Sequence, residues 1–338
     1  MKSRFPFTSF PSGWFFVAYS HKLSRGQVKP LHYFGKDLVL FRTEDGTACV
    51  LDAHCPHLGA HLGYGGKVKG ETLQCPFHGW CFDSNGHCTD IPYANKRPPK
   101  AQMRNWLVRE VNGWIMVYHH TQGHGEFSDW QIPELPEYNS QEWISFQPVR
   151  NWKLRTHIRE LAENGMDVAH LPFLHSQIIA DLKSDGQEAN DSTHIHYLSA
   201  KYRLPPAVSF FGKEVDGALE ITSHGLGCQI SRVRVKSWIE MRILIVFLLT
   251  PIDEEYLDVH LVVSVKEIFN KPITRAIAAI YGKEAVRSLS QDIPILENKV
   301  YLNNPLLCDS EKTLVEYRRW ANQFFLAIPE EIKIPAQH

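Results

Sequence analysis

The sequence has no excess of basic residues and no long hydrophobic run. Its 36 Lys and Arg residues are balanced by 37 Asp and Glu residues, which gives a formal net charge of −1. Nucleic-acid-binding domains usually carry a basic excess, so this balance argues against nucleic acid as a partner. The longest apolar run, ILIVFLL at 243–249, is much shorter than the roughly 20 residues that a membrane-spanning helix needs. The sequence therefore predicts no transmembrane span.

The N-terminus also lacks the unbroken apolar segment of a signal peptide, because prolines and a glycine interrupt it within the first 13 residues. Internal repeats and low-complexity segments are absent as well. The seven cysteines are an odd number in a long chain, which argues against a disulfide framework. Four of them, Cys55, Cys75, Cys81 and Cys88, lie within 34 residues. This pattern favours a metal site in a reducing compartment, and we predict a cytoplasmic location.

The first 120 residues have the sequence pattern of short strands joined by tight turns. Three β-rich segments, 37–53, 80–90 and 106–120, are each centred on Asp-Gly or Asn-Gly, the strongest short-range hairpin signal. They predict a small all-β domain. The stretch 120–141 is rich in Gly, Pro and polar residues and is the best candidate for a linker.

The second part of the chain has a different sequence pattern. Residues 154–170 show a helical pattern, and 240–252 and 256–269 are long strand-like runs joined by an acidic turn. Residues 284–303 look helical, although Pro294 must bend or break that helix unless it lies in a first turn. This part is therefore predicted to be α+β, a sheet with a few long helices.

Two mixed Cys-His pairs stand in the β-rich part, Cys55-Pro-His57 and Cys75-Pro-Phe-His78, separated by 17 residues. Four such ligands suit a tetrahedral zinc ion, but structural zinc sites usually pair Cys with Cys and His with His. Mixed pairs fit a [2Fe-2S] cluster in which two Cys hold one iron and two His hold the other. Of the neighbouring residues, His54 and His61 are expected to be ordinary loop residues. Cys81 and Cys88 are expected to be packed free thiols.

The spacing, with CPHLGAHL before and CPFHGW after, resembles the Rieske motif. Respiratory Rieske proteins carry an extra Cys in each loop and a Ser two residues after the second His; here these positions hold Ala60, Phe77 and Trp80. The covering disulfide cannot form, and one hydrogen bond to cluster sulfur is missing. Fewer such bonds stabilise the reduced cluster less, so we predict a potential of about −150 mV, typical of oxygenases.

A second metal site is indicated further along the chain. His170 and His175 flank Pro172, which is expected to end the preceding helix, so that one His lies on its last turn and the other just after it. Two His and one carboxylate make the facial triad of non-haem iron oxygenases. Two histidines in such a segment are also common as surface or core residues. For the carboxylate, the residues alone leave three candidates open: Asp292, Glu297 and Asp309.

The pattern E-N-x-x-D-x-x-H-x4-H at 163–175 resembles the iron-binding segment of Rieske non-haem iron oxygenases. The resemblance selects Asp292 as the third ligand beside His170 and His175. It implies that Asp167 bridges His170 to His78 of the partner subunit, and the family suggests a homotrimer. It also implies that Asn164 lies near the iron.

The similarity extends over nearly the whole chain, through IPYANKRPPK, WQIPELPEY and QDIPILENKVYLNNPLL. It indicates the branch that holds the oxygenase component of 3-ketosteroid 9α-hydroxylase and the cholesterol 7-desaturases. The implied fold is an all-β Rieske domain at 1–130, with its core at about 14–120, followed at 131–338 by a helix-grip (START-like) catalytic domain. This catalytic domain is expected to hold an antiparallel sheet and long helices.

The resemblance implies a terminal monooxygenase that uses O2, a [2Fe-2S] cluster and mononuclear Fe(II) to hydroxylate a bulky, apolar, possibly steroid-like substrate. A natural-product or aromatic-ring oxygenase and a desaturase are the enzyme alternatives. An electron carrier with an inactive second site is the non-enzyme alternative. SFFG at 209–212, Trp238 and Phe247 are candidates for the pocket wall, or for ordinary core.

No G-x-G-x-x-G follows a predicted strand, so the electrons must come from a partner, a ferredoxin or a flavin-dependent NAD(P)H reductase. Basic residues near the cluster loops are candidates for docking an acidic partner, or form an ordinary solvated surface. They are Lys67, Lys69, Lys96, Arg97 and Lys100.

Overall fold

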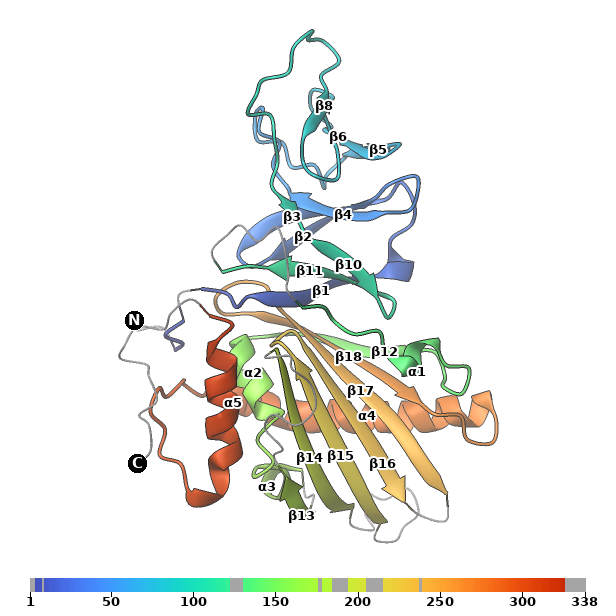
Figure 1. Cartoon of the computed structure of the whole chain (residues 1–338), viewed down its shortest axis with the longest axis vertical. Helices are drawn as coiled ribbons and strands as arrows, with labels where there is room; N and C mark the ends of the chain where they lie inside the picture. The colour runs from blue at the N-terminus through green and yellow to red at the C-terminus, as the bar shows by residue number, and fades with distance from the viewer. Residues whose placement is uncertain are drawn as a thin grey trace. The chain divides into compact units, whose positions relative to one another are not determined.

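The computed structural model describes residues 4–7, 9–121, 130–175, 178–183, 194–204, 215–236 and 239–325 (Figure 1). The chain divides into two compact units. The small-sheet unit contains Trp14–Pro133 and Thr250–Glu254, and the large-sheet unit contains Met1–Gly13, Glu134–Leu249 and Glu255–His338. The expected division into domains at 1–130 and 131–338 stays a prediction.

The small-sheet unit is built from three small sheets of short strands, as the turn signals predicted. The first has the order β1-β11-β10, the second β2-β3-β4-β9 and the third β5-β6-β7-β8. The strands are β1 (Gly13–Tyr19), β2 (Val28–Tyr33), β3 (Lys36–Arg42), β4 (Ala48–Asp52), β5 (Lys67–Lys69), β6 (Thr72–Gln74), β7 (Cys81–Phe82), β8 (Cys88–Asp90), β9 (Asn105–Trp106), β10 (Val108–Val111) and β11 (Trp114–His119), with a 3-10 turn η1 (Ser20–Lys22).

All three predicted hairpins are present, because β3 pairs with β4, β7 with β8 and β10 with β11. At the last of them Asn112 and Gly113 have φ of 54° and 77°. Positive φ at both central residues defines a type I′ turn, whose twist matches that of the flanking strands.

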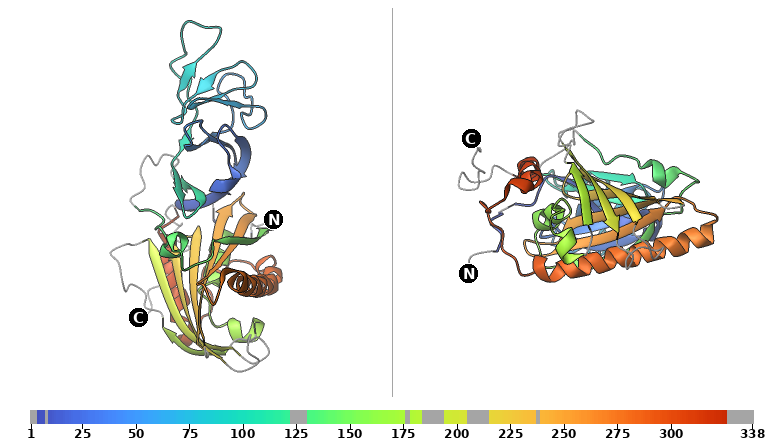
Figure 2. Two further views of the ribbon diagram at one scale, coloured as in Figure 1. Left: turned by 90° about the vertical axis from the view of Figure 1, so that its right-hand side faces the viewer. Right: turned by 90° about the horizontal axis from the view of Figure 1, so that it is seen from below.

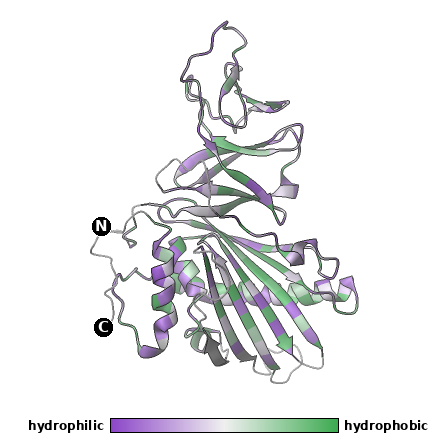
Figure 3. Cartoon of the chain, viewed as in Figure 1, coloured by the Kyte–Doolittle hydropathy of each residue, from purple (hydrophilic) through white to green (hydrophobic). Residues whose placement is uncertain are grey.

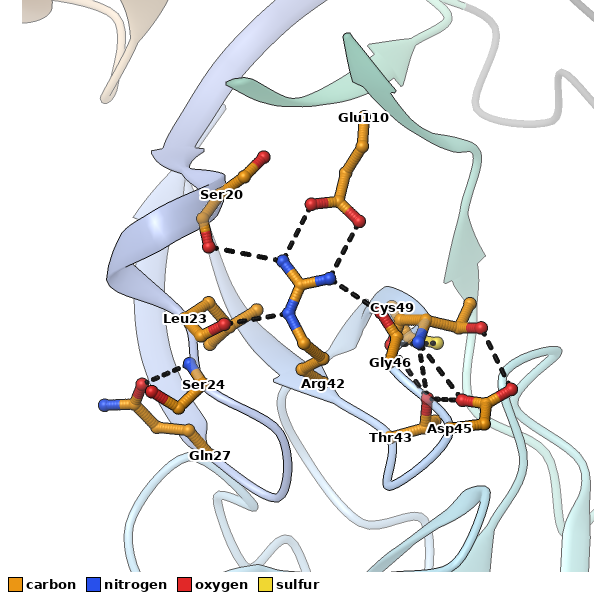
Figure 4. Close-up of polar contacts among 11 residues, drawn as sticks. Ser20, Leu23, Ser24, Gln27, Arg42, Thr43, Asp45, Gly46, Cys49 and Glu110 are labelled. Atoms are coloured by element: carbon orange, nitrogen blue, oxygen red, sulfur yellow. Dashed lines mark hydrogen bonds and ion pairs between the residues drawn. The ribbon is translucent and has the colours of Figure 1, made fainter. Parts of the chain in front are cut away.

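A buried arginine links the loops of this unit through hydrogen bonds (Figure 4). The guanidinium of Arg42, at the end of β3, donates to both carboxylate oxygens of Glu110 on β10, at 2.7 and 2.8 Å. It also donates to the carbonyls of Leu23 at 2.8 Å and Gly46 at 2.7 Å. Burying a guanidinium is costly unless its donors are satisfied, and these contacts satisfy it. One residue thereby fixes two loops and two sheets.

The large-sheet unit contains one seven-stranded sheet of order β12-β18-β17-β16-β15-β14-β13. Hydrophobic residues dominate β17, whose sequence is EMRILIVFLLTP (Figure 3). The strands are β12 (Gln147–Leu154), β13 (Ile178–Lys183), β14 (Ile195–Leu204), β15 (Val215–His224), β16 (Cys228–Lys236), β17 (Glu240–Pro251) and β18 (Leu257–Val265). The helices are α1 (Pro136–Asn139), α2 (Ile158–Asn164), α3 (Leu171–Leu174), α4 (Lys271–Leu296) and α5 (Lys312–Asn322), with a 3-10 turn η2 (Asp309–Glu311).

The long helix α4 runs along one face of this sheet, against β18 and β12 (Figure 2). It begins where the side chain of Asn270 caps the N–H of Ile273. The predicted helix at 284–303 was wrong at both ends: it begins at 271, and residues 297–303 are not helical. Pro294 does not break it, because it lies in the last turn, where only one helical hydrogen bond is lost before the helix ends at Leu296.

The predicted helix at 154–170 was also too long. Leu154 belongs to β12, and α2 covers only 158–164. His157 begins the helix, because its ring accepts a hydrogen bond from the N–H of Arg159, and Gly165 is the C-terminal cap. Among the described residues no helix is both long and apolar enough to cross a bilayer. The cytoplasmic location stays a prediction.

Three buried histidines of the large-sheet unit make its stability depend on pH. Burial, with a smaller effect of Arg159, lowers the pKa of His157 to about 3. Burial lowers the pKa of His196 to about 4, against a small opposing effect of Glu316. Burial and then Arg232 lower the pKa of His224 to about 4. All three rings are therefore neutral in the folded protein at neutral pH.

Because these folded-state pKa values lie below the unfolded value of about 6.5, the stabilisation is complete above that pH and is lost as the pH falls towards 4. Between pH 7.5 and 5.5 we expect each histidine to cost about 1.3 kcal/mol of unfolding free energy, about 4 kcal/mol together. Chemical denaturation at the two pH values measures this. His196→Leu should reduce the difference by about a third, whereas replacing exposed His21 should not. An unchanged pH dependence in His196→Leu would contradict the assignment.

Candidate metal centres and cavity

The segment after α2 places two histidines at the two ends of one short helix. His170 is the N-terminal cap of α3 and His175 its C-terminal cap. Pro172 lies in the first turn of α3, so the expectation that it ends the preceding helix was wrong. Proline is favoured in a first turn because its missing N–H has no helical partner there. Within α3 the chain thus turns once, and the two imidazoles lie edge to face at a ring-centroid distance of 5.2 Å.

Asp292 of α4 completes a three-residue group with these histidines. Its Oδ1 lies 3.2 Å from Nε2 of His175 and 3.8 Å from Nε2 of His170, and one potential ligand atom from each residue falls within 4.8 Å of the others. His175 and Asp292 are buried, and His170 is mostly buried. Of the three carboxylates left open by the sequence, only Asp292 approaches the histidines in this way. Glu297 instead accepts from the N–H of Arg155 at 3.2 Å, and Asp309 lies in η2.

The chemistry of this group suits a divalent metal ion. Oδ1 of Asp292 is buried and receives no well-directed hydrogen bond, although both Nε2 atoms lie close to it. An isolated buried carboxylate oxygen is costly, and two imidazoles with one carboxylate around a common point are the donor set of a facial triad. Two His and one Asp are ligands that non-haem iron prefers.

Asp167 lies beside this group and contacts His170 from the other side. Its Oδ2 is 3.6 Å from Nδ1 of His170, and its Oδ1 accepts from the N–H of Ala169 at 2.9 Å. Burial raises the pKa of Asp167, but His170 and the neighbouring backbone N–H groups outweigh burial and leave the pKa lowered. The carboxylate is therefore ionised at neutral pH. Its side chain keeps 30% of its surface exposed, enough for contact with a further group.

Gln291 lies beside the site, although no sequence pattern selects it. Its Oε1 lies 3.0 Å from Nδ1 of His175. Gln291 and Asp292, which are consecutive on α4, therefore contact the two ring nitrogens of His175. Burial lowers the pKa of His175, but Asp292 and then Gln291 outweigh burial and raise it. A hydrogen bond at Nδ1 fixes the tautomer that leaves Nε2 free to bind a metal.

We expect Gln291→Leu to weaken iron binding by about 10- to 100-fold, because the ring of His175 loses its orienting partner. Titration of the metal-depleted protein with Fe(II) measures the affinity, and Gln291→Glu, which keeps an acceptor, should retain it. Wild-type affinity in Gln291→Leu would rule out an orienting role.

The two Cys-His pairs lie on two loops of the small-sheet unit that have the same backbone geometry. In each loop the cysteine N–H donates to the carbonyl five residues later, at 2.9 Å for Cys55 and 2.8 Å for Cys75. Each cysteine carbonyl accepts from the glycine four residues later, Gly59 or Gly79, and both glycines have φ of 75°. Other residue types rarely adopt this φ, so the glycines allow the loops to turn back on their cysteines.

These loops bring the four candidate cluster ligands together. The rings of His57 and His78 lie 4.6 Å apart, and both thiols are buried. Nδ1 of His57 is buried without a hydrogen-bond partner among the described residues. Burial, mainly, raises the pKa of the Cys55 thiol to about 11, so thiolate at this position needs a compensating cation. Two buried thiols and two imidazoles with a free nitrogen fit a [2Fe-2S] cluster of the Rieske kind.

Trp80 occupies the position of the respiratory serine and gives the cluster site no hydrogen-bond donor. Its ring stacks on His57 at 4.7 Å and 8°, and its Nε1–H donates to the hydroxyl of Tyr93 at 2.8 Å. We therefore expect a reduction potential of about −150 mV in a redox titration followed by electron paramagnetic resonance. Trp80→Phe, which keeps the stacking, should leave it unchanged; a strongly positive wild-type value would contradict the prediction.

The neighbouring residues have other partners. Nε2 of His54 lies 3.2 Å from Asp37, and His61 accepts from the N–H of Gly63 at 3.0 Å. Cys81 and Cys88 are buried free thiols.

A cavity of about 710 Å³ in the large-sheet unit opens onto the His-His-Asp group. Asn164, Asp167, His170, His175 and Asp292 all line it, at one end of α4. Most of its remaining wall is apolar. The sheet contributes Leu219, Ile221, Val233, Ile245, Phe247 and Leu249. Phe247 is thus part of the wall, whereas 209–212 and Trp238 lie outside the described residues.

Comparison with known proteins agrees with this fold and these sites. Residues 13–117 match the Rieske [2Fe-2S] domain, and 117–325 match the 3-ketosteroid 9α-hydroxylase C-terminal domain. Dicamba monooxygenase bound to 3,6-dichlorosalicylic acid has a similar fold, with a TM-score of 0.73 and 19% identity over 94% of this chain and 98% of that one. The fold and the two sites define a Rieske non-haem iron oxygenase.

The particular branch follows from the sequence relatives. Cholesterol 7-desaturase of Xenopus laevis is 31% identical over 96% of this chain and 74% of its own length. The oxygenase component of a 3-ketosteroid-9-alpha-monooxygenase of Rhodococcus rhodochrous is 28% identical over 96% and 83%. The chain belongs to the Rieske oxygenases with a 3-ketosteroid 9α-hydroxylase type of catalytic domain. It is a terminal oxygenase with a [2Fe-2S] cluster and a mononuclear iron, and it depends on electron-transfer partners.

Proposed function

We propose that this oxygenase hydroxylates a bulky, apolar, steroid-like substrate with O2 and externally supplied electrons. The observation that carries the proposal is the cavity, because about 710 Å³ of largely apolar space ends at His170, His175 and Asp292. Ligand pockets of this size bury most of the surface of a drug-sized molecule. The steroid-directed names of the relatives support the same substrate class.

In this proposal Cys55, His57, Cys75 and His78 hold the cluster, and His170, His175 and Asp292 hold the iron. A bound cluster would relay single electrons, and an iron held by the two histidines and Asp292 would supply the activation of O2. The protein contributes binding and exclusion of water. The apolar sheet wall desolvates the substrate, and Gln291 orients His175. Asn164, on the last turn of α2, faces the same cavity and is proposed to lie near the iron.

Asp167 is proposed to link His170 to His78 of the partner subunit within a homotrimer. A carboxylate that accepts from both imidazole N–H groups would orient both rings and shorten the path for electrons. Large apolar side chains are exposed on both units, as a head-to-tail ring with two different contact surfaces requires. They are Leu58, Tyr64, Phe77 and Tyr93 in the small-sheet unit and Phe173, Ile295, Val300, Leu302 and Leu306 in the large-sheet unit.

The electron donor is proposed to be a ferredoxin or a flavin-dependent reductase with an acidic surface. Lys67 and Lys69 are exposed on β5, in the same small sheet as the strands that follow the second cluster loop, and Lys96 and Lys100 are exposed on the loop after β8. Arg97 is partly engaged, because it donates to the carbonyl of Thr89 at 2.7 Å.

We also propose that the Rieske domain covers 1–130 and the catalytic domain 131–338.

Turnover with a surrogate reductase tests the function. Sterols, ketosteroids and aromatic compounds are supplied in parallel, and the products are identified by mass spectrometry. Gain of one oxygen atom by a steroid supports hydroxylation, and loss of two hydrogens without oxygen supports desaturation, as the similarity to the cholesterol 7-desaturases allows. Conversion of aromatic compounds alone would overturn the substrate class. About three irons per chain support an oxygenase, and about two an electron carrier.

A further inference from the structure

One face of α4 lines the cavity and carries a polar residue at each end; we call this face the floor of the cavity. The residues Tyr281, Ala285, Ser288 and Asp292 all line it. Their spacing of four, three and four residues places them on one face of the helix. The eleven residue steps from Tyr281 to Asp292 correspond to about 16 Å along the helix axis. The α4 residues that line the cavity run from Ile280 to Asp292, so Tyr281 and the candidate metal ligand stand at opposite ends of this floor.

The hydroxyl of Tyr281 has no hydrogen-bond partner within the described part of the chain. The ring is partly buried, and burial raises the pKa of its hydroxyl to about 12, so the hydroxyl stays protonated and can donate a hydrogen bond. A hydroxyl that has no partner among the described residues and lines the cavity is available to donate to a ligand oxygen at this end.

Ser231, Lys283 and Ser288 also line the cavity, and three further polar groups of its wall, Gln229, Glu284 and Arg287, have partners of their own. Gln229 on β16 packs against Gly165, the C-terminal cap of α2. The packing is so close that a Cβ on Gly165 would lie 2.3 Å from Oε1 of Gln229. Its Nε2 lies 3.5 Å from the hydroxyl of Ser223. The charged residues Glu284 and Arg287 on α4 pair with each other. Tyr281 is thus the neutral donor most distant from Asp292 along the α4 floor.

We infer that the Tyr281 hydroxyl donates a hydrogen bond to an oxygen substituent at one end of the substrate, and that this contact decides which carbon lies beside the His-His-Asp group. The inference rests on the proposed function and adds a specificity determinant to it. Ala285 and Ser288 are small, which leaves room for a flat ring system over the helix.

Equilibrium binding to the iron-loaded full chain tests the inference with two probes. One is a steroid with a single oxo group on a terminal ring, and the other is the same skeleton without oxygen. We expect the wild type to bind the oxo steroid about tenfold more tightly, which corresponds to one hydrogen bond. Tyr281→Phe removes only the hydroxyl and should abolish the preference while leaving the affinity for the hydrocarbon unchanged. Tyr138→Phe, on α1 and outside the cavity lining, should keep the preference.

Product analysis gives an independent readout. The wild type should oxidise one carbon of the oxo steroid, and Tyr281→Phe should yield a mixture of positions, because the skeleton can slide along the floor. A tenfold preference or a single product retained in Tyr281→Phe would overturn the anchor alone and leave the proposed function standing. Failure of the wild type to bind either steroid would overturn the proposed substrate class and the anchor with it.

Discussion

Asp292→Ala is expected to lose the mononuclear iron and all measurable product formation, while the cluster spectrum stays unchanged. The variant removes one of three donors, and the two histidines that remain cannot complete a facial triad. The affinity for Fe(II) should fall by more than about 100-fold, beyond the loss caused by removing an outer hydrogen bond. Iron analysis should give about two irons per chain instead of three.

Glu297→Ala is the matched control for this variant. It removes a carboxylate five residues further along, at the C-terminal cap of α4, where Glu297 accepts from the N–H of Arg155. We expect it to keep the mononuclear iron and most of the activity. A full complement of iron in Asp292→Ala, or its loss in Glu297→Ala, would show that the carboxylate ligand is a different residue.

Asp167→Ala is expected to keep both metal centres and yet reduce turnover by at least about 100-fold. The carboxylate contacts Nδ1 of His170, the nitrogen that faces away from Asp292, so its loss leaves the metal-facing atoms in place. The missing step should be electron transfer from the cluster, because the proposed bridge to the partner subunit would be removed. Stopped-flow oxidation of the pre-reduced cluster in the presence of substrate and O2 measures it directly.

Two results would separate a bridge from a merely structural role for Asp167. Asp167→Asn keeps a neutral acceptor and should recover part of the electron-transfer rate, whereas a structural role predicts equal defects in the two variants. Unchanged turnover in Asp167→Ala, with normal iron and cluster content, would show that electrons do not pass this carboxylate.

The cluster site could be predicted from the sequence because it is encoded locally. Each loop contains a cysteine, a histidine two or three residues later and a glycine four residues later, and the turn that unites them is closed by its own backbone hydrogen bonds. The hairpins were predictable for the same reason, since Asn-Gly and Asp-Gly dictate the turn wherever they stand. Helix ends were less predictable: the side-chain cap at His157, and the position of Pro172 in a first turn, depend on how the following segment folds back.

The sequence by itself determined the two loops of the cluster site and the pair of histidines on either side of Pro172. It also determined that the first part of the chain is all-β and the second part α+β. The family resemblance selected Asp292 where the residues alone also left Glu297 and Asp309 open, but only the tertiary structure brings this carboxylate, more than 100 residues beyond His175, against the histidines. The same holds for Gln291, which holds the other nitrogen of His175, and for Tyr281 at the far end of the cavity floor. Their roles depend on the packing of α4 over the sheet, which aligns residues three helical turns apart along one cavity, and such alignment between distant segments is a property of the folded chain.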